Sequence, residues 1–147
     1  MNTSKTIMRI KRFLTTTMAI LMILVLASCA RKMTFLTSSI VPAARGDVKV
    51  KKDNNSNYVI KIKLTNLAEV KRLEPSRHAY VVWMESHGSE IKNLGQINSS
   101  SSMLSKTLKA SFETVSSSRP SKIFITAEDE ASVLSPGSMV ILSTSSF

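Results

Sequence analysis

The stretch Tyr80–Ile97, YVVWMESHGSEIKNLGQI, decides the fold that this sequence predicts. The unbroken apolar run from Ala79 to Met84 indicates a central strand that is buried on both faces, and Trp83 is expected to anchor the core. His87-Gly88 supplies a tight turn, because glycine accepts a positive φ without steric cost. In the second strand-like run, Gly95 is expected to mark a bulge or a close approach of another backbone. The stretch therefore predicts a β-hairpin that the rest of the chain covers.

Alternating patterns on both sides of this hairpin predict further strands. Residues 47–51 and 58–65 alternate apolar and polar side chains, which is typical of strands with one face in a core and the other in water. Apolar residues indicate three more strands near 104–112, 123–125 and 139–142. About seven short strands separated by turn signals predict an all-β fold, an antiparallel immunoglobulin-like β-sandwich.

The segments between the strands are expected to be turns and loops. Within Asn66–Pro75, apolar residues recur at every third position, and Asn66 with Glu69 has the spacing of a helix cap. Either one or two helical turns form there, or a crossing loop places these apolar side chains on the edge of the sandwich. The other expected turns and loops are Ser99–Ser102, Ser116–Pro120 and Glu128–Glu130.

Residues 1–28 have the layout of an export signal. The first 12 residues contain four basic side chains and no acidic one, and three threonines alone interrupt the apolar stretch from Phe13 to Ala27. Removal of these 28 residues from the 147 of the chain leaves 119, a normal size for one domain with its own core. The alternative is an uncleaved signal anchor over residues 13–30, which is short for a span of about 20 residues.

The leader ends in Leu26-Ala27-Ser28-Cys29, and this motif resembles the lipobox of bacterial lipoproteins. The resemblance implies that signal peptidase recognises Leu26, Ala27 and Ser28, that the chain is cut before Cys29, and that the thiol of Cys29 carries lipid. In that family the cysteine bears three acyl chains. At ~0.8 kcal/mol per buried CH₂, such an anchor is effectively permanent.

Three parts of the chain are therefore expected. They are a lipoprotein signal peptide over residues 1–28, a lipidated N-terminus and tether over 29–40, and a β-sandwich domain over 41–147. The resemblance implies a lipid-anchored protein of the bacterial cell envelope, whose domain faces the periplasm from the inner or the outer membrane. Because Cys29 is the only cysteine, no disulfide forms within the chain, and packing alone holds the domain together.

The charge of the mature chain is basic but dispersed. Four of the 20 basic residues lie in the leader, which leaves sixteen against 10 acidic residues, a net charge of +6. Lysines such as Lys49, Lys61 and Lys63 alternate with apolar residues, and this pattern favours a solvated sheet face over a nucleic-acid patch. Aromatic residues that stack on bases are scarce. Weak attraction to anionic lipid headgroups or acidic polymers is the alternative that this charge leaves open.

The sandwich also shows a resemblance to a known family. Tyr80-x-x-Trp83, Leu94-Gly95, a strand that ends in Glu128, and the Pro136-Gly137 turn resemble the extracytoplasmic C-terminal domain of anti-sigma-K factors, over about residues 38–146. That domain is a β-sandwich. Here a leader and a lipobox stand where the family has a cytoplasmic sigma-binding domain and a membrane helix. The resemblance therefore implies a sensing or partner-binding module, without the regulatory role.

No pattern predicts a catalytic or metal site. The two histidines, His78 and His87, have no cysteine to join them, so we expect no metal and no cofactor. Glu85 and Glu90 flank the hairpin turn as exposed acids, and Arg45-Gly46-Asp47 is expected to be a turn that starts a strand. No Gly-x-Ser-x-Gly motif is present.

The function expected from the sequence is binding. Tyr80 and Trp83 either line a ligand groove or belong to the core, and aromatic residues within an apolar strand favour the core. We expect a non-enzymatic, membrane-anchored module that binds a protein or another envelope component and no nucleic acid. The alternatives are a small envelope hydrolase that uses loop serines, and an extracytoplasmic sensing subunit.

Overall fold

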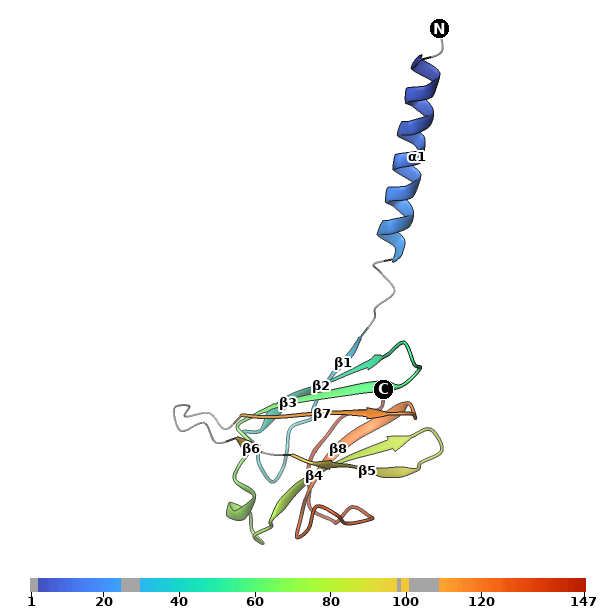
Figure 1. Cartoon of the computed structure of the whole chain (residues 1–147). Helices are drawn as coiled ribbons and strands as arrows, with labels where there is room; N and C mark the ends of the chain where they lie inside the picture. The colour runs from blue at the N-terminus through green and yellow to red at the C-terminus, as the bar shows by residue number, and fades with distance from the viewer. Residues whose placement is uncertain (1–2, 25–29, 98, 101–108) are drawn as a thin grey trace.

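The chain folds as an all-β sandwich preceded by one helix (Figure 1). The computed structural model describes residues 3–24, 30–97, 99–100 and 109–147. Two antiparallel sheets face each other, and the predicted fold class is confirmed. Helix α1 (Thr3–Leu24) coincides with the basic and apolar parts of the leader. Within the described ranges, no helix has both the length and the apolar character needed to cross a membrane.

The first sheet, called sheet A here, has the strand order β1-β2-β3-β7-β6. Sheet B has the order β5-β4-β8-β9. The orders β2-β3-β7-β6 and β9-β8-β4-β5 correspond to the A-B-E-D and G-F-C-C′ sheets of immunoglobulin-like sandwiches. The strands are β1 (Arg31–Thr34), β2 (Arg45–Lys52), β3 (Tyr58–Thr65), β4 (Ala79–Ser86), β5 (Ile91–Gln96), β6 (Ser99–Ser100), β7 (Lys109–Ser116), β8 (Pro120–Glu128) and β9 (Val140–Ser143).

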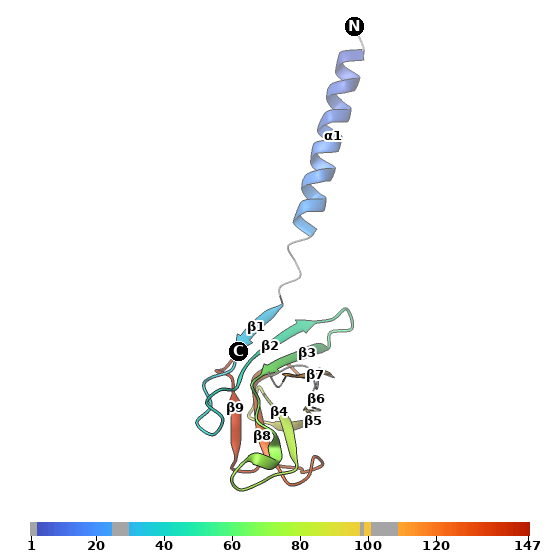
Figure 2. The ribbon, with the colours of Figure 1, turned by 90° about the vertical axis from the view of Figure 1, so that its left-hand side faces the viewer.

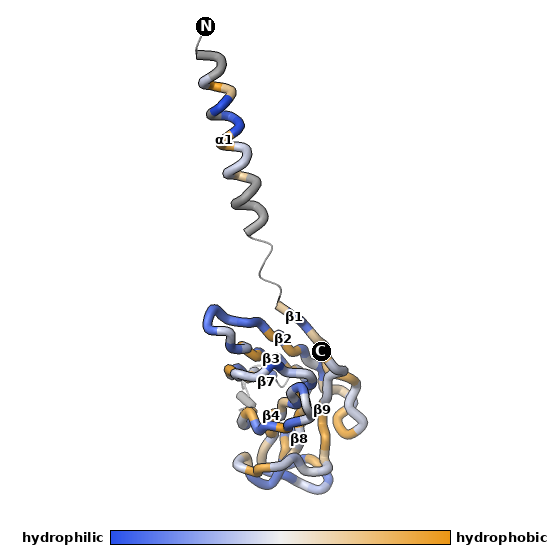
Figure 3. The backbone as a smooth tube through the Cα atoms, turned by 90° about the vertical axis from the view of Figure 1, so that its right-hand side faces the viewer, coloured by the Kyte–Doolittle hydropathy of each residue, from blue (hydrophilic) through white to orange (hydrophobic). Residues whose placement is uncertain are grey.

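Side-chain alternation fills the main core between the sheets. On β3, Ile60, Ile62 and Leu64 are buried, whereas Lys61 and Lys63 are exposed. This is the predicted pattern of a strand with one wet face. The turn that joins β2 to β3 is hydrophilic and lies outside the core (Figure 3). Sheet A therefore buries only its inner face.

Strand β4 is buried on both faces, as predicted, and its two faces belong to different clusters. Tyr80, Val82 and Met84 point into the main core. Val81 and Trp83 point to the outer face of sheet B, where the segment between β8 and β9 covers them. The indole of Trp83 stacks on Phe124 with centroids 6.4 Å apart. Trp83 is thus a buried anchor, as expected, but of this smaller outer cluster.

Hydrogen bonds hold the covering segment over Trp83. The indole Nε1–H donates to Thr126 Oγ1 at 2.7 Å, and that hydroxyl donates to Glu128 Oε1 at 2.5 Å. The same carboxylate oxygen accepts the N–H of Gly137 at 2.8 Å. The amide of Asn93 on β5 donates to two backbone carbonyls of the segment, at 3.0 and 2.9 Å.

Two expectations for the hairpin and the first crossover are confirmed in detail. Gly88 has φ of +96°, and a register shift opposite Gly95 marks the bulge in β5. Between β3 and β4, one 3₁₀ turn, η2 (Val70–Arg72), lies within a crossing loop that buries Leu67 and Leu73. The expected Asn66 cap is wrong, because Glu69 occupies the N-cap position and makes no side-chain capping bond.

Several expected loop residues belong to strands instead. Ser99–Ser100 pair with β7 as β6, and Ser116 is the last residue of β7. Glu128 ends β8 and is 8% exposed, because its carboxylate accepts the two hydrogen bonds described above. The remainder of the expected serine loop and residues 104–108 of the expected strand lie outside the described residues.

The segment that the sequence assigned to a tether is built into the sandwich from Arg31 onward. Residues 31–34 form β1, which pairs with β2, and Phe35 is only 6% exposed. The N–H of Leu36 donates to the carbonyl of Ser143 in β9. Because these contacts tie the segment to both sheets, the folded body begins at residue 31 instead of residue 41.

Replacing Trp83 tests the outer cluster. We expect Trp83→Ala to lower the free energy of unfolding by about 3–5 kcal/mol, because it leaves a large cavity. Trp83→Phe keeps the ring stacking but loses the bond to Thr126, at a cost of about 1–3 kcal/mol. Urea unfolding of a fragment that begins at Ala30 measures both. Leu134→Ala on the same covering segment is the control, since Leu134 is 95% exposed. Equal stabilities of Trp83→Ala and Leu134→Ala contradict this account.

Tyr80 makes the stability sensitive to alkaline pH. Its hydroxyl donates to the Ala68 carbonyl at 3.0 Å, and burial raises the pKa of the phenol to about 12 from 10.0. The unfolded chain therefore loses this proton at lower pH than the folded chain. Stability from this residue is complete below pH 10 and falls as the pH rises toward 12. Tyr80→Phe should make unfolding less dependent on pH between 10 and 12, and an unchanged dependence contradicts the assignment.

Candidate functional site

The predicted lipidation site lies next to the first residue of the folded body. Leu26, Ala27, Ser28 and Cys29 are outside the described residues. Their neighbour Ala30 is described, and β1 begins at Arg31. A group attached to Cys29 is thus two residues from the first residue that pairs with β2.

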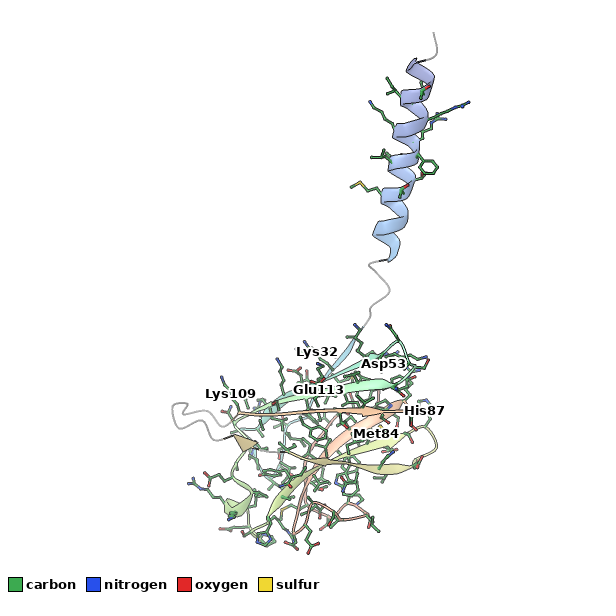
Figure 4. All side chains as sticks on the ribbon, in the orientation of Figure 1. Lys32, Asp53, Met84, His87, Lys109 and Glu113 are labelled. Carbon is green, nitrogen blue, oxygen red and sulfur yellow. The ribbon has the colours of Figure 1, made fainter. Side chains whose placement is uncertain are left out.

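The outer face of sheet A carries a concentration of positive charge, which we call the basic face. Its strands β1, β2, β3 and β7 lie on the side of the sandwich nearest α1 in two perpendicular views (Figures 1 and 2). Figure 4 labels Lys32 on β1, and Lys109 and Glu113 on β7. The basic side chains of this face are Lys32, Arg45, Lys49, Lys51, Lys61, Lys63 and Lys109, and the acidic ones are Asp47 and Glu113.

Strand register aligns some of these charges in one row across the sheet. Lys32 is opposite Lys49, Lys49 is opposite Lys61, and Lys61 is opposite Glu113. Like charges directly opposite each other destabilise a sheet. Lys61 Nζ lies 2.9 Å from Glu113 Oε1, but this pair is exposed and contributes little. The row therefore keeps an excess of positive charge.

Four lysines of the basic face make no ion pair within the described part of the chain. These are Lys49, Lys51, Lys63 and Lys109. Asp47 is 3.8 Å from Lys32, at the long end of an ion-pair distance. The carboxylates on the face are thus engaged elsewhere, and the four ammonium groups are available to an external anion.

An open groove of about 520 Å³ lies on this face. Ala30 lines one part of it, next to the predicted lipidation site. Val59 provides an apolar patch, and it is in register with Val115, which is 56% exposed on β7. The other lining residues are polar or charged: Lys49, Lys51, Lys52, Asp53, Asn54, Lys61 and Glu113.

The two sheets differ in charge. The strands of sheet A contain nine basic and two acidic residues, because Arg31 and Lys52 add to the basic face. The strands of sheet B contain two of each sign, Lys92 and Lys122 against Glu85 and Glu128. The excess positive charge of the strands thus belongs to one side of the molecule. The alternation of lysines with apolar residues predicted a solvated sheet face. It could not predict which lysines lie opposite each other, because that depends on the register between strands.

The histidines do not share a site. His78 precedes β4 and His87 follows it, so about 30 Å of extended chain separates them. Among the described residues, no three of the side chains that commonly ligate metals are close enough to hold an ion.

The described serines that donate side-chain hydrogen bonds donate them to the backbone. Four serine hydroxyls donate hydrogen bonds in the described ranges, and every acceptor is a backbone carbonyl. Glu85 is half-buried and Glu90 is exposed beside the hairpin turn.

Arg45-Gly46-Asp47 forms the first three residues of strand β2, so the expected start of a strand is confirmed, whereas the expected turn precedes these residues. Gly46 packs tightly there, since a Cβ atom would lie 2.6 Å from the Lys63 carbonyl oxygen. Tyr80 and Trp83, the candidate groove residues, are 3% and 0% exposed. They are core residues and line none of the surface described above.

Comparisons with protein-family models, with curated proteins and with solved structures found no match to this chain.

Proposed function

We propose that the chain is a non-catalytic lipoprotein of the bacterial cell envelope, whose β-sandwich binds a protein or another envelope component. The observation that carries this proposal is the position of Cys29. It ends a basic and apolar leader in the motif Leu-Ala-Ser-Cys, and the folded body begins two residues later. Cleavage before Cys29 removes α1 and leaves β1 intact.

The position of Cys29, two residues before β1, favours a direct anchor over attachment through a flexible spacer. Because β1 pairs with β2 over all four of its residues, hardly any free chain remains between Cys29 and the sandwich. A lipid on Cys29 therefore holds the body directly at the membrane surface. Three acyl chains make such attachment effectively permanent.

The surface chemistry supports binding over catalysis. The conspicuous feature of the described surface is a broad charged sheet face, whereas the histidines are at opposite ends of β4 and the aromatic candidates are buried. The likeness to anti-sigma-K domains gives the same binding class, with a sensing role as its variant.

Substitution of Cys29 tests the anchor. Wild-type protein extracted from bacterial membranes should have the mass of residues 29–147 plus three acyl chains, whereas Cys29→Ser should retain residues 1–28 and carry no lipid. Intact-mass spectrometry reads both results. Ala30→Ser is the matched control, because it makes a small polar change beside the motif and should leave the acylated mass otherwise unaltered. Wild-type protein with an intact Met1 and no acyl group contradicts the proposal.

A further inference from the structure

We propose that the basic face of sheet A lies against anionic phospholipid headgroups of the membrane that holds Cys29. This inference rests on the proposed lipid anchor and adds a second contact, made by folded residues. The partner is identified by its chemistry, a surface of phosphodiester groups above an apolar layer.

Cys29 lies close to the basic face along the chain. Consecutive Cα atoms are 3.80 Å apart, and Ala30, the neighbour of Cys29, lines the groove on the basic face. With Cys29 held at the bilayer surface, the groove starts within one residue of that surface. The pairing of β1 with β2 prevents the sandwich from moving away on a flexible linker. Lys32 is three residues from Cys29, roughly 10 Å of extended chain. This is comparable with the Debye length of about 8–10 Å, the distance over which charge acts near physiological salt.

The basic face carries an excess of positive charge. Seven basic and two acidic side chains project from this face, and Lys49, Lys51, Lys63 and Lys109 have no carboxylate partner within the ranges described. Lysines close to an anionic leaflet are attracted to it additively. Phosphates placed between Lys32, Lys49 and Lys61 would also relieve the repulsion within that row.

The residue types of the basic face favour lipid over nucleic acid. All but one of the basic residues of the face are lysines, which act as point charges and lack the planar fork of arginine. No aromatic residue occupies an outward position on β1, β2, β3 or β7, so bases have no stacking platform. Val59 and Val115 instead give the face an apolar patch near the β2–β3 turn, and this patch suits the headgroup boundary.

Contact through this face orients the molecule. The crossing loop that contains η2 and the segment between β8 and β9 lie at the end of the sandwich opposite β1 (Figures 1 and 2). That end carries exposed charges of both signs, including Asp129, Glu130 and Lys71, and the exposed Leu134. It points away from an anionic surface when the basic face lies on it, and it is therefore free for a partner.

Lysine footprinting of the full-length protein tests the contact. The protein purified from membranes is placed in vesicles of phosphatidylcholine, with or without phosphatidylglycerol, and treated with an amine-reactive reagent. We expect Lys49, Lys51, Lys61 and Lys63 to react about fivefold more slowly in the anionic vesicles, and high salt to remove the difference. Lys71 and Lys92, away from the face, should react equally in both. Equal labelling of all lysines in the two vesicle types overturns the inference.

Charge reversal provides the matched variants. Lys49→Glu lowers the net charge of the face from +5 to +3 and should weaken the protection of Lys51, Lys61 and Lys63. It should fold, because glutamate there is opposite Lys32 and Lys61. Lys92→Glu makes the same change on sheet B and should leave protection intact. Protection that is undiminished in Lys49→Glu, or that appears only in native envelopes and not in pure lipid, overturns lipid as the occupant, and the latter result indicates an acidic protein or polymer.

A second measurement on the same samples tests the lipid anchor and the basic-face contact independently. The mass of the N-terminal peptide reports acylation, and the lysine labels report contact. An unacylated chain with protected lysines overturns the proposed function alone. An acylated chain whose lysines are labelled equally in both lipids overturns the basic-face contact alone.

Discussion

The burial of β4 on both faces is the constraint on which the rest of the structure depends. Its run AYVVWM contains no charged residue, and its polar groups are the Tyr80 hydroxyl and the Trp83 N–H, so neither face can remain in water without exposing large apolar side chains. Sheet A covers one face. The other needs a cover that no strand supplies, and the segment between β8 and β9 provides it. Glu128 and Asn93 hold that segment through its backbone, which satisfies polar groups that would otherwise be buried without partners.

Because of this constraint, the two sheets differ in how much of their surface is buried. Both faces of sheet B are packed against other parts of the protein, and only its edges and loops are exposed to water. Sheet A buries one face and leaves the other to solvent, so charged side chains are tolerated there at every second position. The concentration of lysines on that face is therefore compatible with the fold but is not required by it. Neutral or mixed charges would satisfy the same alternation with less repulsion between β1, β2 and β3.

The sequence predicted those parts of the fold whose side chains show a period. The alternation of β2 and β3 located both strands and the direction of their side chains, and the unbroken run of β4 placed it in the centre. β1 and β6 were missed because strands of four and two residues are too short to show a period, and their pairing partners define them. The acidic run Glu128–Glu130 indicated a loop, whereas the family resemblance placed Glu128 at the end of a strand, where it lies. Only its partners in space, Thr126 and Gly137, explain its burial.

The candidate site shows the same division between local and spatial information. The motif around Cys29 is local and stays a prediction. The lysines of the basic face, except Lys32 on the missed strand β1, could be placed on strands from the sequence. The alignment of Lys32 with Lys49 and Lys61 could not, because it depends on how three strands pair. The position of β1 changes what the motif means. A flexible tether would allow a wide range of distances between the sandwich and the membrane. A strand that begins at Arg31 restricts that range. In the arrangement that we propose, a lipid at Cys29 and the positive sheet beside it act on the same surface, and the geometry of attachment follows from the register of β1 with β2.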